Sequence, residues 1–139
     1  MHKTNTHRVN PAGIFDPTPY GFSHSIKIDN PLTMCFVSGQ SAGMGLTHEL
    51  SPDFSTQVRH ALQNLRMQLA AQSFLMQDVV KITLLIVDHT PEKLAIWCEE
   101  ASLAWEEDAL PTSTLIPVQQ LVLPGMLIEI DAIAQRGAF

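Results

Sequence analysis

The chain has 139 residues, of which 45% are hydrophobic and 16% charged, and its net charge at pH 7 is -6. This length predicts a single globular domain with a sizeable core. The acidic balance, without any cluster of Lys and Arg, argues against a nucleic-acid-binding surface. No apolar run reaches the roughly 18 residues that cross a membrane, and residues 1–10 lack the apolar segment of a secretory signal. We therefore expect a soluble, cytoplasmic protein that does not associate with membranes.

The N-terminal segment is expected to be an irregular arm. Residues 1–20 contain Pro11, Pro17 and Pro19, and closely spaced prolines prevent regular strand pairing. The single folded domain is expected to span residues 21–139.

Two strands are predicted at the start of the domain, at residues 23–29 and 33–38. Their sequences are S-H-S-I-K-I-D and T-M-C-F-V-S, and the turn signal Asn30-Pro31 separates them. We expect them to pair as a hairpin.

Two helices are predicted from apolar residues that recur at steps of three and four. The first is expected to begin at Ser51 as N-cap, with Pro52 at the first helical position, and to end near Gln72. Its apolar stripe contains Phe54, Val58, Ala61, Leu62, Leu65 and Leu69, and its polar side Gln57, Arg59, Gln63 and Arg66. The second is expected to begin with Thr90 as cap, and its stripe contains Leu94, Trp97, Cys98, Ala101 and Trp105.

Three further strands are predicted at residues 78–88, 112–118 and 126–134. The first is almost uniformly apolar, which is typical of a central strand. The order of elements predicts an α+β two-layer sandwich, in which both helices cover one face of a mixed sheet. The apolar strands indicate that another subunit covers the other face.

The last predicted strand carries two carboxylates. Strand alternation places Glu129 and Asp131 on one face, and Ile128 and Ile130 on the other. Because an unpaired buried carboxylate is costly, the face with the carboxylates either meets solvent or lines a cleft.

Cysteine and histidine usage predicts neither a disulfide framework nor a metal site. Cys35 and Cys98 are best interpreted as small buried hydrophobic residues. The six histidines include no H-x-x-x-H pair. His24 stays a candidate, either as a polar group that orients a ligand or as a structural hydrogen-bonding residue.

Five sequence blocks in order resemble the RidA/YjgF family of reactive intermediate deaminases, some of whose members are also called L-PSP endoribonucleases. The blocks are V-S-G-Q (37–40), Q-V-R-H-A-L-Q-N-L (57–65), D-V-V-K-I-T-L-L-I-V-D (78–88), L-P-T-S-T (110–114) and I-E-I-D-A-I-A (128–134). The resemblance implies a chorismate-mutase-like fold and a homotrimer with a ligand cleft at each subunit interface. It also implies cofactor-independent hydrolysis of imines or enamines to ketoacids and ammonia.

The resemblance also assigns roles to particular residues. Glu129 matches the glutamate that activates the attacking water, and Ser38 matches the serine of the family's S-G-Q loop. The aromatic position of the first strand is Phe22, with Tyr20 close by. Ser113 stands where the family's deaminases have an arginine that binds the substrate carboxylate, which argues against 2-iminobutanoate and 2-iminopropanoate as substrates.

The sequence therefore leads to two main functional hypotheses. The first is an imine or enamine hydrolase with Glu129 as its catalytic residue; Phe22, His24, Ser38 and Ser113 contact a small-molecule substrate, and no metal or cofactor takes part. The second is a trimer that binds a small metabolite without turnover. A third is a subunit that only assembles. Retention of Glu129 favours the hydrolase, and Ser113 in the arginine position favours the binding protein.

Overall fold

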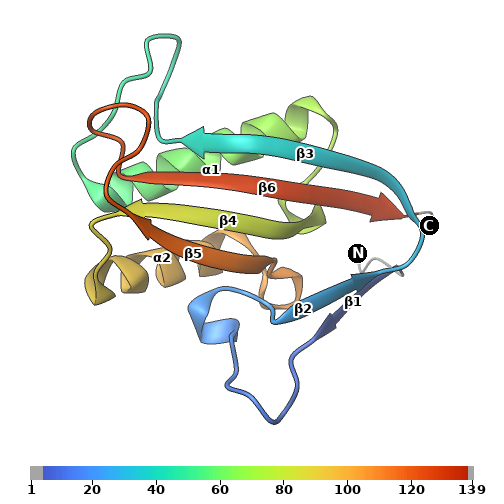
Figure 1. Ribbon diagram of the computed structural model, residues 1–139. Coiled ribbons are helices and arrows are strands. Elements are labelled where there is room, and N and C mark those ends of the chain that lie inside the picture. The colour runs from blue at the N-terminus through green and yellow to red at the C-terminus, as the bar shows by residue number, and fades with distance from the viewer. Residues whose placement is uncertain (1–4, 138–139) are drawn as a thin grey trace.

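The computed structural model describes residues 5–137 and shows an α+β fold (Figure 1). Its strands are β1 (Thr6–Val9), β2 (Ser25–Ile28), β3 (Pro31–Ser41), β4 (Val79–Val87), β5 (Thr112–Val118) and β6 (Ile128–Gly137), and its helices are α1 (Phe54–Ala71) and α2 (Pro91–Ala104). Three short 3-10 turns lie at Thr18–Tyr20, Met76–Asp78 and Glu107–Ala109. Among the described residues, no helix is long and apolar enough to cross a membrane.

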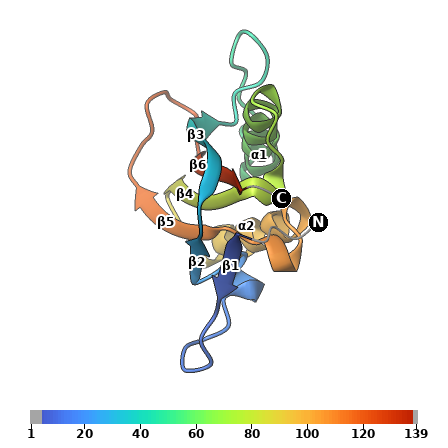
Figure 2. The ribbon, with the colours of Figure 1, turned by 90° about the vertical axis from the view of Figure 1, so that its right-hand side faces the viewer.

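The main sheet has four strands in the order β3-β6-β4-β5. The β4–β5 pair is parallel, while β6 runs antiparallel to both β3 and β4. Both helices pack on one face of this sheet, as Figure 2 shows edge-on. The predicted mixed sheet with two helices on one face is therefore confirmed, and β4 is a central strand as expected.

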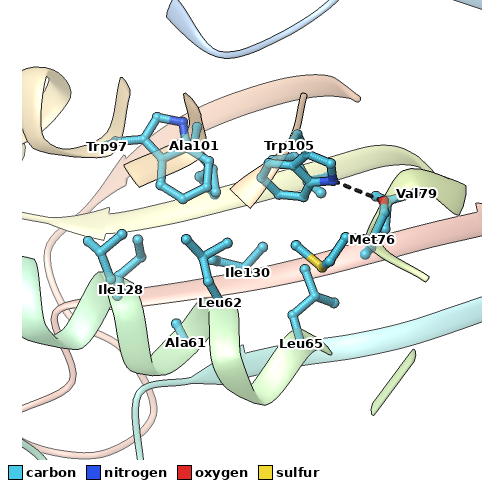
Figure 3. Packing of buried hydrophobic residues seen from close by; sticks show 14 of the residues in the cluster. Ala61, Leu62, Leu65, Met76, Val79, Trp97, Ala101, Trp105, Ile128 and Ile130 are labelled. Carbon is cyan, nitrogen blue, oxygen red and sulfur yellow. Dashed lines mark hydrogen bonds between the residues drawn. The ribbon is translucent and has the colours of Figure 1, made fainter. Parts of the chain in front are cut away.

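The core lies between the helices and the covered sheet face (Figure 3). The predicted stripe of α1 is buried along its whole length. In the predicted stripe of α2, Trp97, Ala101 and the C-cap residue Trp105 are buried. The Trp97 and Trp105 rings meet edge to face at 6.4 Å between centroids. The Trp105 indole N–H donates to the carbonyl of Met76 at 3.0 Å, so this buried polar group is satisfied.

The expected hairpin of the first two strands is wrong. β2 pairs with β1 in a separate two-stranded sheet, and β3 pairs with β6. Asn30 has a φ of 47° and bends the chain without reversing it, so β3 leaves β2 and enters the main sheet. The first part of the expected irregular arm is consequently a strand, because residues 6–9 find a partner in β2.

The expected start of α1 is also wrong. The N-cap is Asp53, whose carboxylate accepts the Thr56 N–H, and the helix begins at Phe54. The Ser51 hydroxyl instead accepts the Asp53 N–H at 3.1 Å, in the turn before the helix. Thr90 caps α2 as predicted.

Gln57 is not on a polar face, because it is fully buried. Its side-chain NH2 donates to the carbonyls of Ser51 and Gly125, and its carbonyl oxygen accepts the N–H of Leu127. The loop between β5 and β6 covers the first turns of α1 at this point, which is why a polar side chain is buried there.

The second face of the main sheet is not covered by any described element (Figure 2). Apolar side chains lie open on it, including Phe36, which is 72% exposed, Met34 at 48% and Ile116 at 43%. We refer to this surface as the open face. It is the face on which Glu129 lies.

Candidate functional site

Glu129 occupies the middle of the open face. It is paired with Ser41 of β3 on one side and Leu85 of β4 on the other. Its carboxylate lies over Gly39, where the Cβ of any other residue would overlap it. Within residues 5–137, the half-buried Glu129 makes no hydrogen bond and no ion pair. A free carboxylate on a partly apolar surface can accept a proton from water, so the geometry is compatible with a general base.

Asp131 shares the face of Glu129, as strand alternation predicted, but it has a different environment. Its carboxylate accepts the main-chain N–H of Thr83 in β4 at 3.0 Å. Asp131 is therefore engaged with the backbone of the neighbouring strand, while Glu129 is not.

Ser38 directly precedes Gly39, over which the Glu129 carboxylate lies, at an irregularity in β3. The pairing of β3 with β6 shifts between Val37 and Gln40, which places Ser38 and Gly39 in a bulge. Ser38 is exposed, and its carbonyl accepts the Gln40 side-chain NH2 at 3.0 Å. The bulge and the carboxylate together form the polar part of the open face.

A pocket of about 440 Å³ lies on the opposite side of the sheet. The arm contributes Phe15 and Tyr20, and Phe22 follows directly after it. Helix α2 contributes Leu94 and Trp97, and the strands contribute Leu84, Ser113 and Leu115. Both candidates for the family's aromatic position, Tyr20 and Phe22, therefore line the same pocket. We refer to it as the arm pocket.

His24 does not line the arm pocket but supports its wall. One of its ring nitrogens is 2.8 Å from the Phe15 carbonyl oxygen, within hydrogen-bond distance. Its ring also meets the rings of Phe15 and Phe22 edge to face, at centroid distances of 4.8 and 5.6 Å. Of the two interpretations of His24, these contacts favour the structural one.

The structure does not bring Glu129 and Ser113 together within one chain. Ser113 is paired with Ile82 of β4, which faces the helices, whereas Glu129 is paired with Leu85, which faces the other way. The sequence-predicted site is thus divided: Phe22 and Ser113 lie at the arm pocket, and Ser38 and Glu129 lie on the open face.

A serine–histidine pair next to Glu129 was missed from the sequence. The Ser41 hydroxyl is 2.6 Å from Nε2 of His48 and also accepts the Gly43 N–H at 3.2 Å. His48 packs against Gly43, so the pair fixes the loop that follows β3. The closely spaced glycines of this loop indicate an irregular backbone in the sequence, but they do not show that His48 contacts Ser41.

The two cysteines lie in different environments. Burial raises the pKa of the Cys98 thiol, which keeps it protonated and unreactive at neutral pH. Cys35 is buried in β3. Over the part of the chain that the structure describes, no three His, Cys, Asp or Glu side chains gather in a way that could hold a metal ion.

Comparison with known proteins identifies the family. The family model described as Endoribonuclease L-PSP matches residues 16–136. No curated protein matches the chain. Among solved structures, YyfB from Yersinia pestis, a Rid-family protein of unknown function, is 30% identical; the match covers 95% of this chain and 99% of that one, with a TM-score of 0.88.

Two further structures support the assignment. The YjgF gene product of E. coli is 30% identical over 74% of this chain and 80% of its own, with a TM-score of 0.64. Protein YJGH is 28% identical over 98% of this chain and 100% of its own, with a TM-score of 0.66. The chain therefore belongs to the RidA/YjgF family, as its five sequence blocks indicated.

Proposed function

We propose that this protein is a cofactor-independent hydrolase of small imines or enamines, which works in clefts between the copies of a homotrimer. The observation that carries the proposal is the free carboxylate of Glu129, held over Gly39 on the open face. Glu129 is the carboxylate among the sequence-predicted site residues, and a carboxylate can accept a proton from water and return it.

The reaction needs one group that first accepts and then returns a proton. Glu129 takes a proton from water as the water oxygen attacks the carbon of the C=N bond. Glu129 returns that proton to the nitrogen, which gives the neutral carbinolamine. The carbinolamine hydroxyl then passes its own proton through Glu129 to the amino nitrogen, the C–N bond breaks as the C=O bond forms, and ammonia leaves. An enamine enters the same sequence after protonation on carbon gives the imine.

The division of the site between two faces supports an intersubunit cleft. Glu129 of one copy cannot reach the arm pocket of the same copy, because the sheet lies between them. Packing of the apolar open face against a second copy brings one copy's Glu129 towards another copy's pocket. This arrangement also removes Phe36 and Met34 from water.

A binding protein without turnover is the second candidate. Ser113 favours it, because a carboxylate-bearing imine loses its charge-assisted contact when serine replaces the family's arginine. The two candidates differ in whether product forms.

Ammonia release decides between them. The substrates are freshly generated 2-iminopropanoate, 2-iminobutanoate and the carboxylate-free acetophenone imine. We expect the wild type to accelerate hydrolysis of acetophenone imine, and Glu129→Gln to reduce that acceleration by about 100-fold. The Ser113→Arg variant is expected to gain hydrolytic activity towards the two carboxylate-bearing imines.

The matched control is Asp131→Asn, on the same strand and face, which keeps an acceptor for the Thr83 N–H and should leave the rate unchanged. Wild-type rates equal to those in buffer for all three imines would establish the binding protein instead. Full activity in Glu129→Gln would remove Glu129 from the mechanism.

A further inference from the structure

We infer that the arm pocket takes an uncharged aromatic molecule, which makes neutral aromatic imines the substrate class if the proposed function holds. The first reason is the absence of charge. Among the described residues, no Lys, Arg, Asp, Glu or His lines the pocket. A carboxylate placed there would lose part of its hydration without gaining a cation, and this penalty disfavours anions.

The basic residue of α2 that is next to the pocket in sequence makes contacts outside the pocket. Lys93 precedes the pocket residue Leu94, but its ammonium lies over the Phe54 ring of α1, 5.0 Å from the centroid. The same ammonium donates to the carbonyl of Val87. Lys93 would have to give up both contacts to serve a ligand carboxylate.

The second reason is the shape of the walls. Phe15 meets Tyr20 and Phe22 edge to face, at centroid distances of 6.0 and 6.2 Å, and Trp97 forms part of the wall contributed by α2. Aromatic rings arranged in this way offer both ring edges and ring faces for contact with a planar aromatic ligand. A volume of about 440 Å³ is sufficient for a substituted single ring.

The third reason is the polar side chain that β5 contributes to the pocket wall. Ser113 lines the pocket, and its hydroxyl makes no hydrogen bond within residues 5–137. A free hydroxyl both donates and accepts, so it suits one neutral C=N, C=O or NH2 group. Together, the three reasons describe a ligand with one aromatic ring and one uncharged polar group.

A matched pair of probes tests the inference without requiring turnover. Benzamide and benzoate have nearly the same shape and differ in charge. Binding to the intact protein can be followed by calorimetry and by tryptophan fluorescence, because Trp97 lines the pocket. We expect benzamide to bind about tenfold or more tightly than benzoate, and Ser113→Arg to reverse that order.

Two variants make the result specific. Ser102→Arg adds the same charge on the exposed side of α2 and should leave the preference for benzamide intact. Leu115→Trp fills the pocket without adding charge and should abolish benzamide binding, while circular dichroism verifies that both variants are folded. Equal or tighter binding of benzoate by the wild type, or no binding of either probe, overturns the inference.

The outcome is separable from that of the hydrolase assay. Benzamide binding without any ammonia release means that the ligand class stands and the proposed activity fails. Hydrolysis of 2-iminobutanoate together with a preference for benzoate means that the activity stands and the ligand class fails.

Discussion

Gln57 shows how one buried amide can tie together distant parts of the chain. It joins the turn at Ser51 to the end of the β5–β6 loop at Gly125 and Leu127, with donor–acceptor distances of 2.6 to 2.9 Å. Helical periodicity in the sequence placed Gln57 among the polar residues of α1. That placement failed because periodicity describes one helix, whereas the burial comes from a loop almost 70 residues later in the chain.

We expect Gln57→Leu to lower the free energy of unfolding by about 2–3 kcal/mol, because two carbonyls and one N–H lose their partner in a site with little water. Gln57→Glu should be worse at neutral pH, since a carboxylate cannot donate to the two carbonyls. Urea unfolding measures both. Gln63→Leu, on the exposed side of the same helix, is the control and should change stability little. Equal stability of the Gln57 and Gln63 variants would contradict this account.

The positions of single residues also show why the candidate site could be predicted only in part from the sequence. Alternation within β6 correctly placed Glu129 and Asp131 on one face, because a strand's own geometry determines which of its residues share a side. It could not tell whether Ser113 of β5 shares that side, because this depends on the register of β5 against β4. Register is a property of two strands, and the residue pattern within one of them does not determine it.

At the scale of elements, the N-cap of α1 predicts a dependence of stability on pH. Asp53 accepts hydrogen bonds from the Thr56 hydroxyl at 2.7 Å, the Thr56 N–H at 2.9 Å and the Ser55 hydroxyl at 2.8 Å. The first of these is the largest of the causes that lower the pKa of Asp53 below its usual value. Because the folded pKa lies below the unfolded one, Asp53 stabilises the fold above the unfolded pKa, and this contribution is lost as the pH falls through the folded pKa.

The comparison of Asp53→Asn with the wild type isolates this effect, because asparagine also caps helices but does not titrate. We expect the melting temperature of the wild type to exceed that of Asp53→Asn at pH 7, and the difference to shrink below about pH 4. Asp53→Ala should melt lower than both at pH 7. A difference between wild type and Asp53→Asn that is the same at pH 7 and pH 3 would mean that the cap charge does not contribute.

The elements themselves were easier to predict than their partners. Apolar periodicity and capping residues are local, so both helices and the strands β3 to β6 lie close to their expected positions. The pairing of β2 with β1 was missed because residues 6–9 look irregular beside so many prolines, and they become a strand only through that partner. The 11-residue β3 is then free to pair with β6 along almost its whole length.

At the scale of the whole molecule, the open face is the feature that a single chain leaves unexplained. A protein of 139 residues has enough apolar residues to build one core, and here that core lies between the helices and the sheet. Phe36 on β3 and Ile116 on β5 lie at opposite edges of the other face, so its apolar character extends across the sheet. Exposed apolar surface of this extent usually marks a contact with another molecule, and a second copy of the chain fits the proposed cleft.

The assembly is testable through Phe36, whose side chain is 72% exposed in the single chain. We expect light scattering to give the wild type a mass three times that of the 15.4 kDa chain. Phe36→Asp should shift that mass towards the monomer, because a buried carboxylate without a partner opposes association. Leu103→Asp places the same charge at a residue that is 75% exposed on α2 and should remain a trimer. If both variants and the wild type are monomers, the open face needs another partner, and the proposed cleft between copies must be abandoned.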